Sequence, residues 1–375
     1  MIDELIQRSD VGDVLERALS GERLSVKDGV RLFGSRDIHA IGACAHRVRL
    51  QLHGLRTHYI VNRHINYTNI CKNRCKFCAF SRELGDETAY TLDINDIVKR
   101  AEQEYKTIRF TELHIVGGCH PSLKLDYYVD LLRALKERFP NVHLQAFTAV
   151  EIAHIADVSG LSIEEVLHIL RSAGLGSLPG GGAEVFCNSV RDVLCPEKLS
   201  ASKWLGVMRV AHELGIRSNA TMLFGHIESP EDRAEHIVAL RDLQDSTGGF
   251  LSFIPLKFHP SNTRLAHLAR GVDVIDDLKV YAVSRLMLDN VPHIKAFWIM
   301  LGLKLAQVAL NYGADDIDGT VVEEHITHSA GATTPEGLTV TQLIGLVEGA
   351  GFVPVERDTL YNEVIRNEAG VPAIS

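Results

Sequence analysis

The chain has 375 residues, 46% of them hydrophobic, which is enough for one large barrel or two ordinary domains around a substantial core. A net charge of −9 and a pI near 6.1, with Lys and Arg scattered along the chain, disfavour nucleic acid or an anionic membrane as partner. The acidic start MIDELIQRSD differs from a signal peptide and the longest apolar stretches are too short to cross a bilayer, so we expect no membrane insertion and a cytoplasmic protein.

The first 55 residues have the spacing of amphipathic helices. Apolar residues recur at helical intervals over residues 11–19, 26–33 and 38–52, and Ser25 stands where a helix cap is expected. We therefore predict an N-terminal helical segment over residues 1–55.

From about residue 56 the pattern changes to short apolar runs that alternate with capped helical segments. Ser162 and Glu165 have the spacing of a capping box, and Ser229 precedes Pro230 at a helix start. Eight strands are predicted, at residues 59–67, 112–116, 143–148, 176–178, 218–224, 251–256, 295–300 and 315–319.

Strands that alternate with helices indicate a parallel sheet. Eight repeats suit an α/β fold of the (β/α) TIM-barrel type, fully closed or partly open, over residues 56–320. A doubly wound sheet is the alternative, but no predicted strand ends in a dinucleotide glycine fingerprint. Residues 321–375, with a predicted helix at 340–348, are expected to form a C-terminal closure.

Three of the seven cysteines, Cys71, Cys75 and Cys78, follow the first predicted strand with gaps of three and two residues. An odd total with three members crowded together fits a reducing compartment better than a disulfide framework. Four thiolates usually hold a [4Fe–4S] cluster, so three would leave one iron open for a ligand.

The cysteine spacing, with Phe77 just before the last cysteine, resembles the signature of the radical S-adenosylmethionine (SAM) superfamily. The resemblance implies a [4Fe–4S] cluster on Cys71, Cys75 and Cys78, with SAM bound at the open iron. A zinc site and simple core packing remain as alternatives. The fourth zinc ligand would then be Cys119, Cys187 or Cys195.

Glycines and acids at other strand ends are candidate contacts for SAM. Gly117 and Gly118 would let the backbone approach a ligand closely, and by the same resemblance they take the place of a Gly-Gly-Glu motif. Cys119 stands where that motif has its acid. Glu184 follows three consecutive glycines, and Glu228 ends another strand. A plain turn at the glycines, a solvated acid at Glu184 and a helix-start charge at Glu228 remain as alternative explanations.

Over nearly the whole chain, several segments together resemble the aminofutalosine synthase family of menaquinone biosynthesis. They include HINYTNIC, HIVGGCHP, LPGGGAEVF, SNATMLFGHIE and FIPLKFHPSNT. The resemblance implies that SAM is a co-substrate, whose 5′-deoxyadenosyl radical adds to the vinyl group of 3-[(1-carboxyvinyl)oxy]benzoate. The implied products are 6-amino-6-deoxyfutalosine, methionine and carbon dioxide or bicarbonate. An external electron donor such as flavodoxin or ferredoxin is implied as well.

A substrate with two carboxylates requires cationic or hydrogen-bonding groups. At predicted strand ends the candidates are Arg82, Asn219, His226, Lys257 and His259, although each has an ordinary structural explanation as a surface charge, a cap or a buried polar group. Other polar side chains that could line the cavity or serve local structure are His64, Asn66, Asn69, Thr148 and Glu151.

Two other functions compete with this interpretation. A cyclic dehypoxanthine futalosine synthase would use the same cluster to abstract hydrogen and close a ring, but the segment FIPLKFHP favours the aminofutalosine synthase form. A non-catalytic iron–sulfur electron carrier would have a cluster whose spectrum does not change when SAM is added.

Overall fold

Seven parallel strands form a curved sheet through the centre of the molecule, in the order β2-β3-β4-β5-β6-β7-β8. The structure is a computed structural model that describes residues 2–267, 274–367 and 370–374. The strands are β2 (Asn62–Ile65), β3 (Glu112–Ile115), β4 (His143–Ala146), β5 (Ser177–Leu178), β6 (Arg217–Phe224), β7 (Phe250–Lys257) and β8 (His293–Ile294). Each follows its predecessor in the chain, so every connection runs the same way around the sheet.

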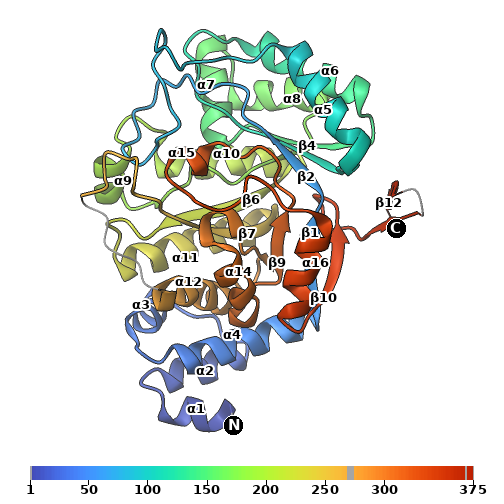
Figure 1. Cartoon of the computed structure of the whole chain (residues 1–375). Helices are drawn as coiled ribbons and strands as arrows, with labels where there is room; N and C mark the ends of the chain where they lie inside the picture. The colour runs from blue at the N-terminus through green and yellow to red at the C-terminus, as the bar shows by residue number, and fades with distance from the viewer. Residues whose placement is uncertain (1, 268–273, 368–369, 375) are drawn as a thin grey trace.

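Helices connect these strands and cover the outer face of the sheet (Figure 1). Between β3 and β8 they are α6 (Leu125–Arg138), α7 (Ala149–Ser159), α8 (Ile163–Ala173), α9 (Asn188–Leu194), α10 (Ala201–Glu213), α11 (Pro230–Thr247) and α12 (Val274–Met287), while α5 (Ile94–Ile108) follows β2. The predicted capping box of Ser162 and Glu165 starts α8, and Ser229 caps α11 with Pro230 in its first turn. Local sequence therefore sets where these helices begin.

Four N-terminal helices pack at one end of the molecule, as Figure 1 shows in blue. They are α1 (Ile2–Arg8), α2 (Gly12–Leu19), α3 (Val26–Gly34) and α4 (Ile38–His53). Helix α3 contacts α11, and α4 contacts α12. Because Ser25 and Asp28 form a reciprocal capping box, α3 begins where the sequence places its cap.

A second sheet has the order β10-β1-β9 and is parallel throughout. Its strands are β1 (Arg56–Ile60), β9 (Asp316–Gly319) and β10 (Val353–Arg357). The prediction of one strand over residues 59–67 is therefore wrong. The chain crosses from this sheet to the larger one at Val61, because β1 pairs with β9 and β10 whereas β2 pairs with β3.

The barrel is open, as one of the two predicted forms allowed. Within the described residues, the backbone pairing between the segment around β9 and the larger sheet consists of isolated bridges, Lys295 with Asp316 on one side and Arg63 with Val322 on the other. The predicted strand at residues 295–300 is also wrong. Strand β8 ends at Ile294, and α13 (Trp298–Leu301) begins four residues later, with the Trp298 indole bonded to the Gly319 carbonyl.

The C-terminal part packs beside β9 and β1. It contains α14 (Leu303–Ala309), the 3₁₀ turn Leu310–Tyr312, α15 (Ile326–Ser329), α16 (Val340–Gly349), β11 (Val364–Arg366) and β12 (Pro372–Ile374). Among these elements, α16 has a clear pattern in the sequence, as does the neighbouring strand β9. Among the described residues, no helix has both the length and the apolar character that a membrane crossing requires.

Candidate active site

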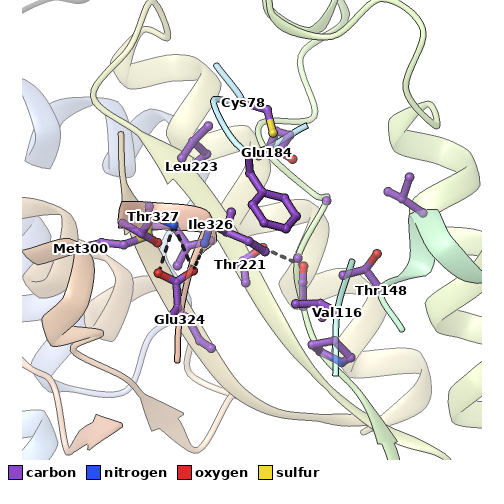
Figure 2. Close-up of a pocket in the computed structure, with 18 of the residues that line it drawn as sticks. Cys78, Val116, Thr148, Glu184, Thr221, Leu223, Met300, Glu324, Ile326 and Thr327 are labelled. Atoms are coloured by element: carbon purple, nitrogen blue, oxygen red, sulfur yellow. Dashed lines mark hydrogen bonds between the residues drawn. The ribbon is translucent and has the colours of Figure 1, made fainter. Parts of the chain in front are cut away.

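A cavity of about 320 Å³ opens at the carboxyl ends of the parallel strands. This is the end at which barrels of this kind carry their active sites, because the loops after all strands converge there. Figure 2 shows Cys78 and Glu184 among the lining residues, with Glu324 and Thr327 across the cavity from Thr148. The volume suits a small organic ligand.

The three cysteines of the motif lie on the loop after β2, and all three line this cavity together with Phe77. Cys75 is buried, while Cys71 and Cys78 are partly exposed, and none is in a disulfide. The backbone amide of Cys119, on the loop after β3, donates a hydrogen bond of 3.3 Å to the Cys71 thiol. Three free thiols around one cavity are the donor set that an iron–sulfur cluster with an open iron needs.

Arg82, predicted as a substrate contact, is not among the residues that line the cavity. Its guanidinium donates to the backbone carbonyls of Ala79, Phe80 and Ser81 and to the Thr88 hydroxyl. The residue holds the cysteine loop in shape, because a guanidinium has enough donors to satisfy several carbonyls at once.

Gly117 and Gly118 lie against the cysteine loop at distances that exclude a side chain. A Cβ atom on Gly118 would stand 2.2 Å from the Ile70 carbonyl oxygen, and one on Gly117 would stand 2.8 Å from the Tyr67 ring. Their backbone therefore lines the cavity directly, as a surface that a ligand can approach closely.

Two cysteines outside the motif sit beside ligand cysteines. A hydrogen bond from Cys119 lowers the pKa of Cys71 to about 6, and burial helps to hold the pKa of Cys119 well above its usual value. At the second pair the direction is reversed: Cys75 donates to Cys195, which lowers the pKa of Cys195 and holds that of Cys75 well above its usual value. A thiolate is the form that binds metal, so the Cys119 hydrogen bond favours metal binding at Cys71.

Glu151 supports the glycine pair from the start of α7. Its carboxylate accepts hydrogen bonds from the Gly117 amide at 2.9 Å and the Tyr67 hydroxyl at 2.8 Å, and its second oxygen caps α7 at Thr148. Burial raises the pKa of Glu151 to about 7 despite these bonds. The carboxylate thus joins the loop after β3 to the loop after β4.

A buried ion pair lies beside the cysteines. The ammonium of Lys198 is 2.5 Å from a carboxylate oxygen of Glu184 and 5.4 Å from the centre of the Phe77 ring. All three side chains line the cavity. A cation and an anion side by side are complementary to the carboxylate and ammonium groups of an amino acid.

A second lysine, Lys295, lies deeper in the barrel, next to β9. Its ammonium is 3.3 Å from Asp318, and both side chains are buried in the cavity wall. Burial raises the pKa of Asp318, which favours its neutral form. Nearby, the rings of His64 and His114 stack with their centres 4.4 Å apart, and burial lowers the pKa of both. Lys295 and Asp318 therefore form a buried ion pair in the cavity wall.

Asn219 and His259 line the cavity, as expected, and both also have partners in the protein. The Asn219 amide donates to Gln145 at 3.4 Å and accepts from the Ser252 hydroxyl at 3.0 Å. A nitrogen of His259 is 2.9 Å from the Met300 carbonyl, and burial lowers the pKa of this histidine. Both present uncharged polar groups to the cavity.

Three other predicted contacts lie outside the cavity lining: Glu228, His226 and Lys257. Although burial opposes it, bonding to His226 and the charge of Arg233 lower the pKa of Glu228 to about 2. Glu228 caps the backbone amides of Gly225 and His226. The ammonium of Lys257 is 2.5 Å from Asp277. Glu228 and His226 therefore stabilise the turn after β6, and Lys257 is occupied by an ion pair.

Glu324 closes one side of the cavity (Figure 2). Its carboxylate accepts from the amides of Ile326 and Thr327 and so caps α15. His328 lies 3.4 Å from the same carboxylate and bonds the Thr334 carbonyl with its other nitrogen. The bond to Glu324 raises the pKa of His328 to about 9.

Replacing His328 by glutamine is expected to lower the melting temperature in a pH-dependent way. Protonated His328 is favoured in the folded state, so its contribution is complete below about pH 6.5, the ordinary histidine pKa, and is lost as the pH rises through about 9. We expect a deficit of about 1–3 °C near pH 6 that disappears near pH 10. Thermal unfolding of both proteins across this range measures it, and a deficit that does not change with pH would contradict this role.

Lys198, Lys295 and Glu324 were not among the predicted site residues. Lys198 lies in an irregular loop and Lys295 directly follows the short strand β8. Neither lysine belongs to a sequence motif whose spacing would identify it as a site residue. Glu324 directly precedes the segment HITHSAGA. That segment has no known ligand pattern, so nothing in the sequence marked this residue. Only folding brings these charges to one cavity.

Comparisons with known proteins agree with this geometry. The radical SAM superfamily matches residues 65–240, and the CofH/MqnC C-terminal region matches residues 247–369. An aminodeoxyfutalosine synthase from Thermus thermophilus is 46% identical over 94% of this chain and 95% of its own length. Methylornithine synthase shares the fold, with a TM-score of 0.73 over 91% of this chain and 97% of that structure, at 19% identity.

Relatives with other names are nearly as similar. A 5-amino-6-(D-ribitylamino)uracil–L-tyrosine 4-hydroxyphenyl transferase from Methanopyrus kandleri is 40% identical over 97% of each chain. A cyclic dehypoxanthine futalosine synthase from Halalkalibacterium halodurans is 39% identical over 95% of each chain.

Proposed function

The chain belongs to the radical SAM enzymes of the CofH/MqnC group, and we propose that it is the member that joins the 5′-deoxyadenosyl group of SAM to 3-[(1-carboxyvinyl)oxy]benzoate. The product would be 6-amino-6-deoxyfutalosine, formed with methionine and carbon dioxide or bicarbonate. The 46% identity to an aminodeoxyfutalosine synthase supports this choice over the other two named activities.

The family implies a [4Fe–4S] cluster and SAM, and the residues present fit both. Three free thiols converge on the cavity, a glycine backbone lies against them, and a paired cation and anion stand beside them. Cys71, Cys75 and Cys78 would hold the cluster, which, reduced by an external donor such as flavodoxin or ferredoxin, would supply the electron for the cleavage of SAM to methionine and the adenosyl radical. All other functions of the site fall to the protein's own residues.

We assign the end of the cavity near the cysteines to SAM. Lys198 would bind the SAM carboxylate, and Glu184 would accept hydrogen bonds from its ammonium or ribose. Gly117 and Gly118 would offer backbone groups to the same amino acid end, in place of the acid that Cys119 replaces. The buried Glu151 would hold this glycine pair in position, since it bonds the Gly117 amide.

We assign the deeper end of the cavity to the benzoate substrate. Lys295 is the cation available there, with Asp318 as a poor competitor for its charge. Asn219 and His259 add neutral hydrogen-bonding groups. With Lys198 assigned to SAM, Lys295 would bind one carboxylate of the benzoate substrate and hold its vinyl group toward SAM. The placement of Lys295 in the cavity wall, together with three free thiols on the cysteine loop, is the observation that carries the proposal.

A product assay tests the proposal. The reconstituted, reduced enzyme would receive SAM with one of three substrates: 3-[(1-carboxyvinyl)oxy]benzoate, dehypoxanthine futalosine, or tyrosine with 5-amino-6-ribitylaminouracil. We expect only the first to be consumed, and mass spectrometry should find a product that contains the adenosine moiety. Consumption of either other substrate, with free 5′-deoxyadenosine as the nucleoside product, would overturn the proposal.

A further inference from the structure

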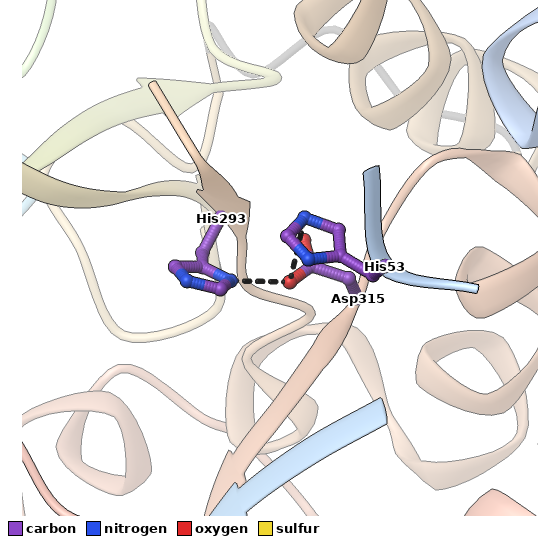
Figure 3. Close-up of side chains that lie close together, drawn as sticks. All are labelled: His53, His293 and Asp315. Carbon is purple, nitrogen blue, oxygen red and sulfur yellow. Dashed lines mark hydrogen bonds and ion pairs between the residues drawn. The ribbon is translucent and has the colours of Figure 1, made fainter. Parts of the chain in front are cut away.

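Three histidines and an aspartate meet at the end of the barrel opposite the cavity. His53 ends α4, His58 lies in β1, His293 begins β8, and Asp315 directly precedes β9. These positions are at the amino ends of the strands, far from the loops that form the active site. Figure 3 shows the rings of His53 and His293 on either side of the Asp315 carboxylate.

One carboxylate oxygen is the centre of this cluster. The Asp315 Oδ2 atom lies 2.6 Å from His293 Nδ1, 3.5 Å from His53 Nε2 and 3.7 Å from His58 Nδ1. His58 Nδ1 is buried and makes no hydrogen bond that satisfies it. Three imidazole nitrogens from three separate elements therefore face a single oxygen, and at least one of them lacks a partner.

These distances are close to those between the ligands of a zinc ion. Zinc bonds to histidine nitrogen and carboxylate oxygen are about 2.0–2.2 Å long, so two ligands of a tetrahedral site are about 3.3 Å apart. His53 and His58 already stand near that distance from Asp315 Oδ2. His293 would need to move outward by less than about 1 Å to join them.

The surroundings favour neutral rings and a charged carboxylate. Burial lowers the pKa of His53 to about 4 and lowers that of His293, so both rings are in the form that binds metal at neutral pH. Arg285 bonds the other oxygen of Asp315 at 2.5 Å and keeps the carboxylate anionic. The ring of Tyr361 stacks on His293 at 3.6 Å, which fixes the orientation of that imidazole.

We propose that His53, His58, His293 and Asp315 bind a divalent cation of the zinc type. Neutral imidazoles with one carboxylate form a donor set that suits zinc rather than magnesium or calcium. Binding would require each neutral ring to carry its proton on the nitrogen away from the ion, on Nδ1 of His53 instead of Nε2, which now faces the Pro292 carbonyl, and on Nε2 of His293 instead of Nδ1, which now faces Asp315. The ion would join α4 and β1 to β8 and β9 where the barrel does not close, and so would act in stability rather than in the radical reaction.

Zinc retention by the cluster-loaded enzyme tests this inference. The protein would be incubated with zinc salt without oxygen, passed through a desalting column and analysed for metal. We expect about one zinc ion per chain, with nitrogen and oxygen neighbours at about 2.0–2.2 Å in X-ray absorption spectra. Sulfur neighbours at about 2.3 Å would place the zinc on cysteines and overturn the proposal.

Variants separate the site from nonspecific binding. We expect His53→Gln and, independently, His58→Gln to lose the zinc, while His168→Gln, at an exposed histidine of α8, retains it. Zinc should raise the melting temperature of the unmodified enzyme by roughly 5 °C and leave that of His53→Gln unchanged. The proposal would be overturned if the unmodified enzyme retained no zinc. It would also be overturned if His53→Gln and His58→Gln retained as much zinc as the unmodified enzyme. These readouts do not depend on which substrate the enzyme uses.

Discussion

Replacing Cys75 by alanine is expected to abolish both the iron–sulfur cluster and the enzymatic activity. Cys75 is the buried member of the three cysteines that line the cavity, and two thiolates cannot hold a cluster that already lacks one protein ligand. Loss of a residue that only supports a metal ligand costs about 10–100-fold, so loss of a ligand should exceed 100-fold. Iron content and the visible absorption of the reconstituted protein measure the first effect, and turnover measures the second.

Cys195 provides a matched control for this substitution. It is also buried and lies beside Cys75, but it is in the turn after α9 and does not line the cavity. Cys195→Ala removes the same atoms from nearly the same place, and we expect it to keep its full iron content. If Cys195→Ala lost the cluster as completely as Cys75→Ala, the assignment of the three ligands would be wrong. Retention of a full cluster by Cys75→Ala would contradict it as well.

The second large effect is expected at Lys295. Lys295→Met keeps the length of the side chain and removes the cation that we assign to a substrate carboxylate. Hydrogen bonds to charged groups are worth about 1.5–3 kcal/mol, so kcat/KM for the benzoate should fall roughly 10–100-fold. Burial raises the pKa of Asp318, and loss of the lysine charge would raise it further, so the substitution favours an uncharged aspartic acid over an unpaired buried carboxylate. Cluster content and the binding of SAM should not change.

Lys257→Met is the corresponding control. Lys257 also pairs with a buried aspartate at a strand end, but its ammonium lies 2.5 Å from Asp277 and outside the cavity lining. We expect its kcat/KM to stay within about twofold of the unmodified enzyme, with any loss appearing in thermal stability. A larger kinetic effect at Lys257 than at Lys295 would reverse our assignment of the substrate end.

The cluster motif could be identified from the sequence because its chemistry is local. Cys71, Cys75 and Cys78 lie within eight residues, and their spacing alone brings three thiols to one loop. Helix starts such as Ser162 and Ser229 were equally predictable, since a cap is decided by residues within one turn.

The rest of the site depends on the direction in which each side chain points, which the spacing of residues in the sequence does not determine. Glu228, His226 and Lys257 follow predicted strands, as expected, but their side chains turn to local partners instead of the cavity. Lys198 and Lys295 had no motif, and they reach the cavity because a loop and a short strand end there. Strand order could be predicted, whereas the side of the backbone on which each polar group emerges could not.

Whether the barrel closes could not be predicted from the sequence either, because it depends on which strands pair. The pattern of residues 59–67 is that of one strand, yet it serves two sheets, and the change at Val61 has no turn residue to mark it. The strand β10, which pairs with β1, lies about 290 residues further along the chain. Only tertiary contacts select that partner.

The fate of the adenosyl group tests the central claim most directly. The enzyme would be reduced and supplied with 3-[(1-carboxyvinyl)oxy]benzoate and SAM carrying ¹³C throughout its ribose. The proposed addition predicts that the full label appears in 6-amino-6-deoxyfutalosine, in equal amount to the methionine released. Label found only in free 5′-deoxyadenosine, with a product that contains none, would show that the radical abstracts hydrogen and would contradict the account.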